Sequence, residues 1–477
     1  MTEYVIKGVA PVALAQYFEE ISAIPRASGN ESGIADYLVS FAKAHGFFCY
    51  RDETNNVFMK KPASAGKENA APLLLQAHTD MVAEKNAGIK HDFEKDGIRL
   101  VQEGNILRAD GTTLGADDGF GVAAILTLLA SNEEHPALEC LFTSSEETGM
   151  DGVIAFDYSH ISSRTLLNFD SGVEQEILCG CCGGIRTDLC VDMTRKESAA
   201  SGLRVKVTGL CGGHSGEDIH RGRGNALTVM ASLLHAVREV CELRIAEVNG
   251  GDKSNAIPRE CEAVIFAADE NAARAAIERV AGEWKAQTVA EDSALEITVE
   301  AAACTATFDV ADTDRILVLL STTGGVMAWH PDMKDMPYTS RNVASVRTGD
   351  TCVCVVVSHR SFSMPEIEKS AAELAARAES IGGSSHEHNG YPGWESPLSS
   401  PLATAWQEAY TAVTGKHAHT AVVHAGLECG MIADHLPGLT AISVGPNIYD
   451  LHTPAERMEL DSFTRFYATL IAFLKKA

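Results

Sequence analysis

Acidic and histidine side chains follow a series of apolar segments in the first third of the chain. The segments read LLLQAHTDMV, TTLGADDGFGVA, CLFTSSEETG and TLLNFDSG, and the side chains are His78, Asp80, Asp117, Glu146, Glu147 and Asp170. One imidazole with several carboxylates suits Zn²⁺, Co²⁺ or Mn²⁺ better than copper. Carboxylates gathered in a buried cluster would repel one another, and one or two divalent cations would remove that cost. A later histidine, His452 in YDLHTPAERM, could complete a second metal site.

The elements that carry these side chains would bring them to one edge of a sheet. Strands are expected at 72–78, 137–144 and 165–172, and a helix at 119–131. Strands that alternate with helices predict a mostly parallel sheet with helices on both faces. In such sheets ligands bind at the carboxyl ends of the strands. On a strand, residues i and i+2 point to the same face, so His78 and Asp80 could lie side by side.

Each residue also has a purely structural interpretation. Asp117 could cap the helix that follows it, and the acids at 146–147 and 170 could be ordinary turn residues. His452 alone is weak evidence, because the chain has 17 histidines. The occurrence of all of them after successive apolar strands favours a metal site.

The length and composition of the chain limit the class of protein to which it can belong. At 477 residues the chain suggests two or three domains. Apolar residues make up 45% and charged residues 22%, as in a soluble globular protein. The net charge of −26 disfavours nucleic acid or an anionic membrane as partner. We expect no secretory signal, and no stretch reaches the roughly 18 apolar residues of a membrane span.

The cysteines favour a reducing compartment. There are 13 of them, an odd number that is scattered along the chain, which argues against a disulfide scaffold. Cys352 and Cys354 alternate with valines in a strand-like run, and no CxxC pair suggests structural zinc. The simplest location is the cytoplasm.

The character of the sequence changes near residue 185. GIRTDLCVDM and SGLRVKVTGL alternate like half-buried strands, and RGNALTVMASLLHAVREV has the pattern of an amphipathic helix. A second round of elements is expected, with strands at 295–304 and 352–359 and helices near 312–321 and 365–380. Two α+β portions in series would account for this order. The segment 382–397 is rich in Gly, Ser and Pro, which is typical of a linker.

Nine motifs occur in an order that resembles a known family. They are AHTDMV, GADDGFGVA, SSEETGMDG, NFDSG, GGHSGEDIHRGRGNA, SNAIPRE, SHRS, HAGLECG and LHTPAERM. Together they resemble the two-metal aminopeptidase/carboxypeptidase/aminoacylase superfamily, and within it the carnosinase-like aminoacyl-histidine dipeptidases. The resemblance runs from about residue 10 to the last helix. It implies an α/β, zinc-peptidase-like catalytic domain with a mostly parallel sheet flanked by helices (1–184 and 391–477) and an inserted α+β lid domain of two portions (185–390).

The resemblance assigns a role to most of the acidic and histidine residues. The metal ligands would be His78 and Asp170 on one ion, Glu147 and His452 on the other, and Asp117 as the bridge between them. The two ions, zinc in the first place and cobalt or manganese otherwise, would share a water and lower its pKa.

Two acids beside these ligands would act without binding metal. Asp80 would hydrogen-bond and orient His78. Glu146 would be the general base that takes the water's proton and later delivers it to the leaving amine. The family also implies a cis peptide bond between Asp117 and Asp118.

The inserted region would contribute the residues that contact substrate. The resemblance implies that His214 of GGHSG stabilises the oxyanion, and that Asn255 of SNAIP and Arg360 of SHRS bind the substrate. Arg360 would suit a free C-terminal carboxylate, and the backbone at Gly426 in HAGLECG would line the pocket. Alternatively, His214 could be a loop residue between glycines and Arg360 could serve an internal salt bridge.

The function implied by the resemblance is that of a metal-dependent dipeptidase that hydrolyses Xaa-His dipeptides. A homodimer is expected, because family members use the lid for dimer contacts. An aminoacylase or a broader di- or tripeptidase would keep the chemistry and change the substrate. A catalytically inactive binding protein is disfavoured by Glu146 beside Glu147. A two-metal phosphoesterase is disfavoured because no phosphate-cradling Gly-rich loop with a following lysine occurs.

Overall fold

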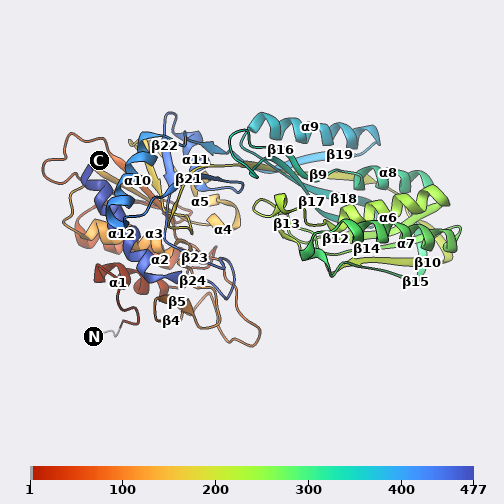
Figure 1. The fold of residues 1–477 in the computed structure, drawn as a ribbon, viewed down its shortest axis with the longest axis horizontal. Coiled ribbons are helices and arrows are strands. Elements are labelled where there is room, and N and C mark those ends of the chain that lie inside the picture. The colour runs from red at the N-terminus through yellow and green to blue at the C-terminus, as the bar shows by residue number, and fades with distance from the viewer. Residues whose placement is uncertain (1–3, 477) are drawn as a thin grey trace. The chain divides into compact units, whose positions relative to one another are not determined.

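Residues 4–476 are described by the computed structural model, and their contacts divide them into two units (Figure 1). Unit 1 holds residues 4–181, 394–422 and 427–476, and unit 2 holds 182–393 and 423–426. Each unit has its own sheet and its own hydrophobic core. The chain therefore leaves unit 1 after residue 181 and returns to it at residue 394 to complete the same sheet.

The sheet of unit 1 is mixed. Its order is β1-β2-β6-β3-β7-β22-β8-β20, with β21 beside β8. The strands are β1 (Phe48–Arg51), β2 (Val57–Lys61), β3 (Leu73–His78), β6 (Leu138–Thr143), β7 (Thr165–Asn168), β8 (Glu176–Cys181), β20 (Trp394–Glu395), β21 (His419–Val423) and β22 (Thr440–Ser443). The four central strands β6, β3, β7 and β22 are parallel, as predicted, whereas β1, β2, β8 and β20 pair antiparallel. The carboxyl ends of β6, β3 and β7 consequently meet at one edge.

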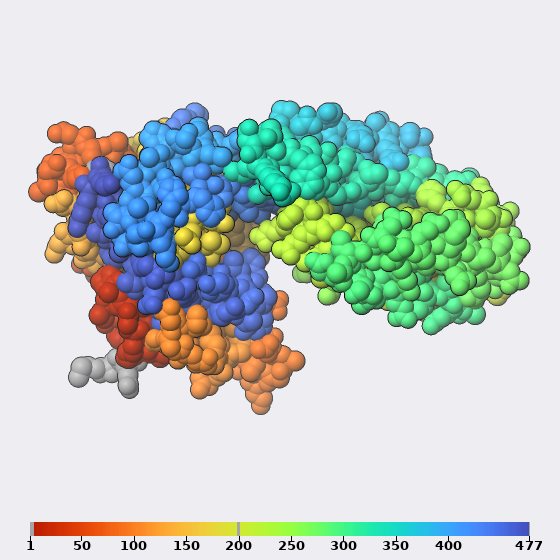
Figure 2. Space-filling view, viewed as in Figure 1, coloured from red at the N-terminus to blue at the C-terminus, as the bar shows by residue number. Residues whose placement is uncertain are grey.

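Helices cover this sheet and close its core. They are α1 (Val12–Ser22), α2 (Ser32–His45), α3 (Ala116–Ala130), α4 (Glu146–Gly149), α5 (Asp151–Ala155), η1 (Tyr158–His160), α10 (Pro401–Thr414), α11 (Glu428–His435) and α12 (Leu460–Lys476). α3 is apolar all round and is buried between α1 and β3. Elements from near both ends of the chain meet within unit 1, where the rings of Phe18 on α1 and Phe463 on α12 are 6.1 Å apart. In Figure 2 the red surface of the first helices adjoins the dark blue surface of the last part of the chain.

A small antiparallel sheet in unit 1 holds the loop at residues 450–456 in place near the start of α3. Its order is β23-β24-β5-β4, with β4 (Leu100–Glu103), β5 (Ile106–Ala109), β23 (Ile448–Tyr449) and β24 (Arg457–Glu459). The loop between β23 and β24 carries His452. Pairing of β24 with β5 thus fixes a C-terminal loop close to the segment that leads into α3.

The sheet of unit 2 is antiparallel throughout the pairs that join its named strands. Its order is β15-β10-β14-β12-β17-β18-β9-β19, with β16 beside β17. The strands are β9 (Gly183–Asp192), β10 (Lys196–Thr208), β12 (Leu243–Gly250), β14 (Cys261–Ala267), β15 (Glu296–Thr307), β16 (Gly325–Trp329), β17 (Pro337–Thr348), β18 (Cys352–Ser361) and β19 (Ser384–Tyr391). A first group of four strands (β15, β10, β14 and β12) meets a second group of five (β16, β17, β18, β9 and β19) at β12 and β17, where Gly250 opposes Val346.

Four helices of unit 2 cover its sheet. They are α6 (Ala226–Val240), α7 (Glu270–Gln287), α8 (Val310–Leu320) and α9 (Met364–Ser380), with the short elements β11 (Gly213–His214), η2 (Ile219–Arg221), β13 (Ala256–Ile257) and η3 (Ala290–Asp292). The side chains of Asn225 and Asp269 cap α6 and α7 by accepting backbone N–H bonds.

The segment 382–397, predicted as a linker, contains the point where the chain passes from unit 2 to unit 1, but half of it is the edge strand β19, which pairs with β9 alone. Its residues are small, polar and largely exposed, which an edge strand tolerates because one side of it faces solvent. The same composition is typical of a loop, so local sequence could not separate the two.

One disulfide joins the second group of strands. Cys190 on β9 and Cys354 on β18 are directly opposite each other and bonded, and the other eleven cysteines, all within residues 4–476, form no disulfide. A single cross-strand bond is compatible with the expected lack of a disulfide scaffold. No helix among residues 4–476 is long and apolar enough to cross a membrane.

A buried histidine of unit 2 is held in its neutral form. Nδ1 of His359 lies 2.8 Å from Oγ of Ser370, and Nε2 lies 3.1 Å from Oγ1 of Thr187. Because Ser370 Oγ already accepts two N–H bonds from Arg341, its hydroxyl donates to Nδ1, which must be unprotonated. Burial, and then the charge of Arg341, lower the pKa of His359 to about 3.

This histidine predicts a loss of stability in mild acid. The unfolded chain takes up the proton near its ordinary pKa of about 6.5, so between about pH 3 and 6.5 the unfolded state binds more protons. The contribution is complete above about pH 6.5 and decreases by up to about 1.4 kcal/mol per pH unit below it. Urea unfolding at about pH 7 and about pH 5 measures the decrease. His359→Asn should flatten it relative to the exposed control His386→Gln, and equal pH dependence in both variants would contradict the assignment.

Candidate active site

The carboxylate of Asp117 lies between two histidines. Its Oδ1 is 3.0 Å from Nε2 of His78, and its Oδ2 is 3.2 Å from Nε2 of His452. His78 is the last residue of β3, Asp117 stands at the start of α3, and His452 comes from the loop between β23 and β24. One carboxylate can therefore offer one oxygen to each of two neighbouring ions.

The other expected ligands complete two groups around Asp117. Nε2 of His78 is 3.9 Å from Oδ1 of Asp170, and Nε2 of His452 is 3.2 Å from Oε2 of Glu147. Three sets have ligand atoms that all lie within 4.8 Å of one another: His78 with Asp117 and Asp170, Asp117 with Glu147 and His452, and His78 with Glu146 and Glu147. The structure thus brings together all five side chains that the sequence singled out as ligands, with Asp117 common to the first two sets.

The electrostatics of this cluster fit a cation. Burial, and then neighbouring carboxylates, raise the pKa of Glu146, Asp170 and Glu147 above the usual range. Burial opposes ionisation of Asp117, but hydrogen bonds from His452 and His78 outweigh it and hold its pKa low. Oε1 of Glu147 is buried without a hydrogen-bond partner. Carboxylates and imidazoles packed in this way form a donor set suited to one or two divalent ions.

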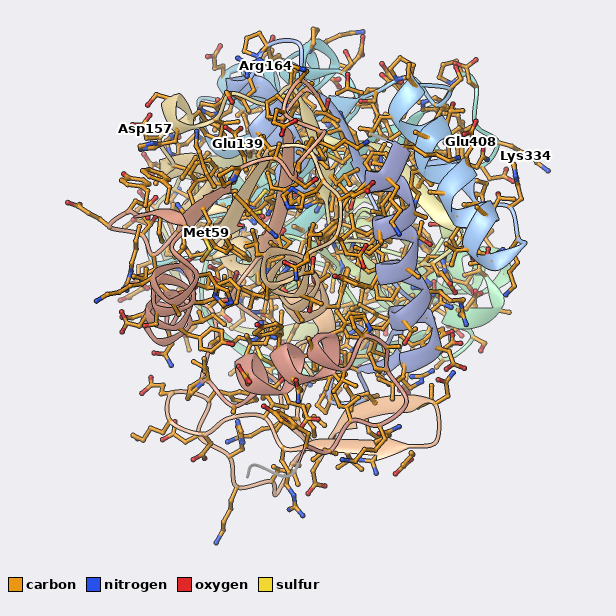
Figure 3. The ribbon with its side chains drawn as sticks, turned by 90° about the vertical axis from the view of Figure 1, so that its left-hand side faces the viewer. Met59, Glu139, Asp157, Arg164, Lys334 and Glu408 are labelled. Atoms are coloured by element: carbon orange, nitrogen blue, oxygen red, sulfur yellow. A yellow bond between two sulfur atoms is a disulfide. The ribbon has the colours of Figure 1, made fainter. Side chains whose placement is uncertain are left out.

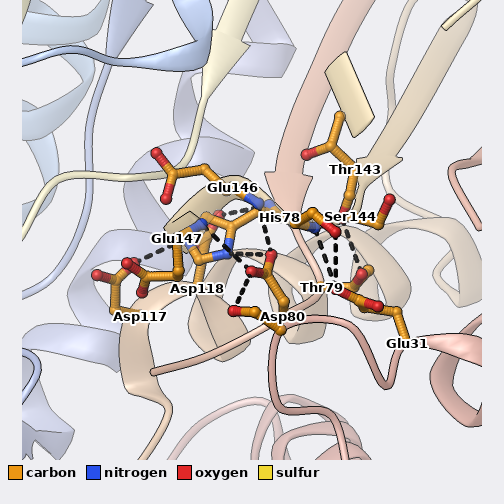
Figure 4. Close-up of polar contacts among 12 residues, drawn as sticks. Glu31, His78, Thr79, Asp80, Asp117, Asp118, Thr143, Ser144, Glu146 and Glu147 are labelled. Carbon is orange, nitrogen blue, oxygen red and sulfur yellow. Dashed lines mark hydrogen bonds and ion pairs between the residues drawn. The ribbon is translucent and has the colours of Figure 1, made fainter. Parts of the chain in front are cut away.

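Asp80 lies beside His78, but most of its hydrogen bonds are with other residues. Its Oδ1 is 3.4 Å from Nδ1 of His78, longer than a good N–H···O hydrogen bond. Its carboxylate accepts the backbone N–H groups of Glu146 (3.0 Å) and Glu147 (3.2 Å) and the hydroxyl of Ser28 (2.7 Å) (Figure 4). The principal contacts of Asp80 therefore hold the Glu-Glu turn against the end of β3.

Asp118, not Asp117, has the capping position of α3. The backbone of Asp117 and Asp118 is not helical, so the regular helix begins after them. Oδ1 of Asp118 accepts the N–H of Gly121 at 3.1 Å, and its Oδ2 accepts the N–H of His78 at 3.1 Å. The peptide bond between Asp117 and Asp118 is cis, as predicted. Asp117 is left free of capping and points toward the histidines.

Sequence reasoning missed Glu456, which holds the segment that leads into Asp117. Its buried carboxylate accepts backbone N–H groups of the segment before α3: Leu114 at 2.7 Å, Gly115 at 3.0 Å and Ala116 at 2.8 Å. These N–H groups precede the regular helix and have no helical partner, so the distant carboxylate satisfies buried donors that would otherwise be unpaired. The motif LHTPAERM contains this glutamate, four residues after His452.

A second missed residue is Glu428. It lies in HAGLECG, two residues after Gly426, and it is fully buried at the start of α11. Only the charged residue type in an otherwise apolar motif could have drawn attention to it.

The four expected substrate-binding residues all belong to unit 2: His214, Asn255, Arg360 and Gly426. His214 on β11 opposes the residue after Asn255 on β13, and the N–H of Ser215 donates to the carbonyl of Asn255 at 2.8 Å. Nδ1 of His214 accepts the N–H of Glu217 at 3.2 Å. The neutral ring therefore carries its proton on Nε2, where it can be donated.

Arg360 and the segment of Gly426 are linked through one face of the unit 2 sheet. Arg360 on β18 is directly opposite Ser340 on β17, so their side chains share a face. Oγ of Ser340 is 2.7 Å from Nε2 of His424, two residues before Gly426. One terminal nitrogen of Arg360 donates to the hydroxyl of Tyr391 at 2.7 Å, whereas its Nε is buried without a hydrogen-bond partner.

The glycine-rich loop of His214 packs against the same segment. A Cβ at Gly216 would lie 2.2 Å from the carbonyl oxygen of His424 and 3.2 Å from the ring of His214. Glycine is required here by the close approach of the two backbones. The loop of His214 and the strand of Arg360 thus both contact His424, directly or through Ser340, and His424 is two residues before Gly426.

Comparison with known proteins identifies relatives that match the whole chain. The family model described as peptidase family M20/M25/M40 matches residues 74–476. The cytosol non-specific dipeptidase of Escherichia coli (strain K12) is 34% identical over 478 residues, which cover 99% of each chain. The crystal structure of aminoacylhistidine dipeptidase from Vibrio alginolyticus has a TM-score of 0.85 at 34% identity, covering 100% of this chain and 98% of that chain.

A more distant structure shares the fold. An aminopeptidase from Bacillus cereus has a TM-score of 0.57 at 15% identity, covering 98% of this chain and 99% of its own. The predicted α/β metallopeptidase fold is confirmed by these matches.

Proposed function

The chain belongs to peptidase family M20/M25/M40, and from that premise we propose that it is a metal-dependent dipeptidase whose centre is the cluster around Asp117. The observation that carries the proposal is the position of Asp117 between His78 and His452. Glu146 lies close to His78 and is not one of the five proposed metal ligands. Hydrolysis of a peptide bond needs an activated water and a proton donor for the leaving amine, and this arrangement offers both.

Five side chains would hold two divalent ions. His78 and Asp170 would bind one, Glu147 and His452 the other, and Asp117 both. The mixed nitrogen and oxygen donors favour zinc, with cobalt or manganese as alternatives. When bound, such ions act as Lewis acids and make water acidic enough to be a nucleophile near neutral pH.

Glu146 would move the proton. It is a carboxyl group close to His78 and Glu147 but outside the five proposed ligands, and a carboxyl group in this position can act as general base and then as general acid. It would take a proton from the attacking water as the new C–O bond forms, and deliver it to the amine nitrogen as the C–N bond breaks. Asp80 supports this role by holding the backbone N–H of Glu146.

The residues of unit 2 would recognise the substrate. We propose that Nε2–H of His214 donates to the oxyanion, and that the guanidinium of Arg360 binds the free C-terminal carboxylate. The buried Nε of Arg360 that lacks a partner supports this role. Asn255 and the backbone at Gly426 would complete the same subsite.

Two substrate ranges are compatible with this metal centre. We propose Xaa-His dipeptides, supported by the full-length similarity to aminoacylhistidine dipeptidase from Vibrio alginolyticus. A broader dipeptidase is the second candidate, because the Escherichia coli relative is named non-specific. Metal-loaded protein assayed on β-Ala-His, Ala-His, Ala-Ala and N-acetyl amino acids separates them. Turnover confined to the histidine peptides supports the first, equal turnover of Ala-Ala the second, and turnover of the N-acetyl substrates alone would indicate an aminoacylase.

We also propose a cytoplasmic homodimer. The Escherichia coli relative is described as cytosolic, and the edge strand β16 of unit 2 exposes Met327 and Trp329, by 45% and 54%. Exposed apolar side chains on a sheet edge are suited to contact with a second chain. Light scattering on the purified protein gives the molar mass directly.

His214→Ala should lower kcat by about 10²–10³-fold, the usual effect of removing one oxyanion donor. The metal content and the melting temperature should remain unchanged, because His214 is not among the proposed ligands. His220→Ala, an exposed histidine of the same loop, is the matched control. A fully metallated His214→Ala protein with wild-type kcat would leave His214 as a loop residue only.

A further inference from the structure

A fully buried carboxylate lies behind the metal-binding strand ends of unit 1. Oε2 of Glu428 accepts hydrogen bonds from Nε2 of Gln76 at 2.5 Å and from Oγ1 of Thr143 at 2.7 Å. Its Oε1 is buried without a hydrogen-bond partner, and both hydrogen bonds to its Oε2 come from uncharged side chains. A buried carboxylate without a cationic partner is costly, so a positive charge nearby would stabilise it.

The bonds of Gln76 continue to a second strand. Oε1 of Gln76 accepts from Nδ2 of Asn168 at 2.6 Å, and the two residues are direct partners in the parallel pair β3–β7. Gln76 precedes His78 by two residues, and Asn168 precedes Asp170 by two. Residues two apart on a strand share a face, so the Gln76–Asn168 pair lies next to the His78–Asp170 pair.

Thr143 adds a third strand to the same network. It is the last residue of β6 and the register partner of His78 on β3, and its hydroxyl donates to Glu428. Through these bonds one carboxylate ties together the ends of β6, β3 and β7. None of its hydrogen bonds reaches α4 or the β23–β24 loop, which carry Glu147 and His452.

We propose that Glu428 is a positioning residue for one of the two ions, the one assigned to His78 and Asp170. Its network fixes the strand ends that carry these ligands, and its negative charge lies behind the same ion. A divalent cation bound there favours the ionised form of the carboxylate. The proposal rests on the proposed function, since it presupposes a two-metal centre.

The test compares Glu428→Gln and Glu428→Ala with Glu139→Gln. Glutamine keeps an oxygen that can accept from Gln76 and Thr143 but removes the charge, whereas alanine removes both. Glu139 is the matched control, because it is a buried carboxylate at the other end of β6, held by Ser162, Ser163 and Lys60 (Figure 3). The metal-free proteins are titrated with zinc by calorimetry. Asp170→Ala and His452→Ala identify which of the two binding events belongs to which ion.

Glu428→Ala should weaken the event lost in Asp170→Ala by about 10–100-fold, the usual effect of removing a partner of a metal ligand. Glu428→Gln should weaken the same event by a smaller factor, and Glu139→Gln should change neither. Equal weakening of both events, or unchanged affinities in Glu428→Gln and Glu428→Ala, would overturn the proposal while leaving the two-metal centre intact. A wild-type chain that binds no zinc would overturn the proposed function, and this proposal with it.

Discussion

Glu146→Gln should reduce kcat by about 10²–10⁴-fold, the range that a positioned general base contributes. The amide has the size of the carboxylate and keeps the backbone N–H bond to Asp80, but it cannot take a proton from water. Because Glu146 is not among the five proposed ligands, both ions should remain bound. The measurement is kcat on the best dipeptide substrate, with the metal content of each preparation determined by elemental analysis.

Glu53→Gln is a suitable control for this experiment, because Glu53 is an exposed acid of the same unit. It should retain wild-type kcat and melting temperature. A fully metallated Glu146→Gln protein with near-normal kcat would show that another group moves the proton. Loss of metal from that variant would instead place Glu146 among the ligands, as the third of the close-packed sets allows.

Asp117→Asn should abolish most activity through the metals themselves. The carboxylate of Asp117 presents one oxygen beside His78 and the other beside His452. An amide has only one oxygen that can bind metal, so asparagine cannot bind an ion on each side. We expect fewer than two ions per chain and a loss in kcat/KM of at least about 10³-fold, since several kcal/mol of transition-state stabilisation depend on the metal pair. Elemental analysis and initial rates measure the two effects.

Asp110→Asn provides the comparison for Asp117→Asn. Asp110 is exposed, lies seven positions earlier and pairs only with Arg99, so its variant should bind metal and turn over normally. Two tightly bound ions in Asp117→Asn would contradict the bridging role.

The central part of the site was predictable because parallel strands converge. His78 and Asp170 each follow an apolar run, and the register of β3 with β7 brings such ends together. That argument needs only the pattern of apolar residues. His452 comes from a loop with no such pattern, and its place beside Asp117 could be expected only from the family resemblance.

Other features depend on partners that are distant in the sequence. Glu456 accepts the N–H of Leu114 across 342 positions, and no local pattern marks a carboxylate that binds the backbone of a remote segment. The strand β19 has the composition of a loop and becomes a strand only because β9 offers it a free edge. Likewise, Cys190 and Cys354 are separated by 164 positions, and only the register of β9 with β18 makes them neighbours.

The route of the chain through its two units also sets the order in which they can be completed on the ribosome. Every strand of the unit 2 sheet has been translated before β20, β21 and β22 are made. Until then β8 has no partner in the sheet of unit 1, because its neighbours are those three later strands. His452 is the last of the five proposed ligands to emerge, well after His78 and Asp170. A nascent chain can therefore complete the sheet of unit 2 first, whereas the segment 423–426 of that unit and the two-metal centre are completed only when synthesis is almost over.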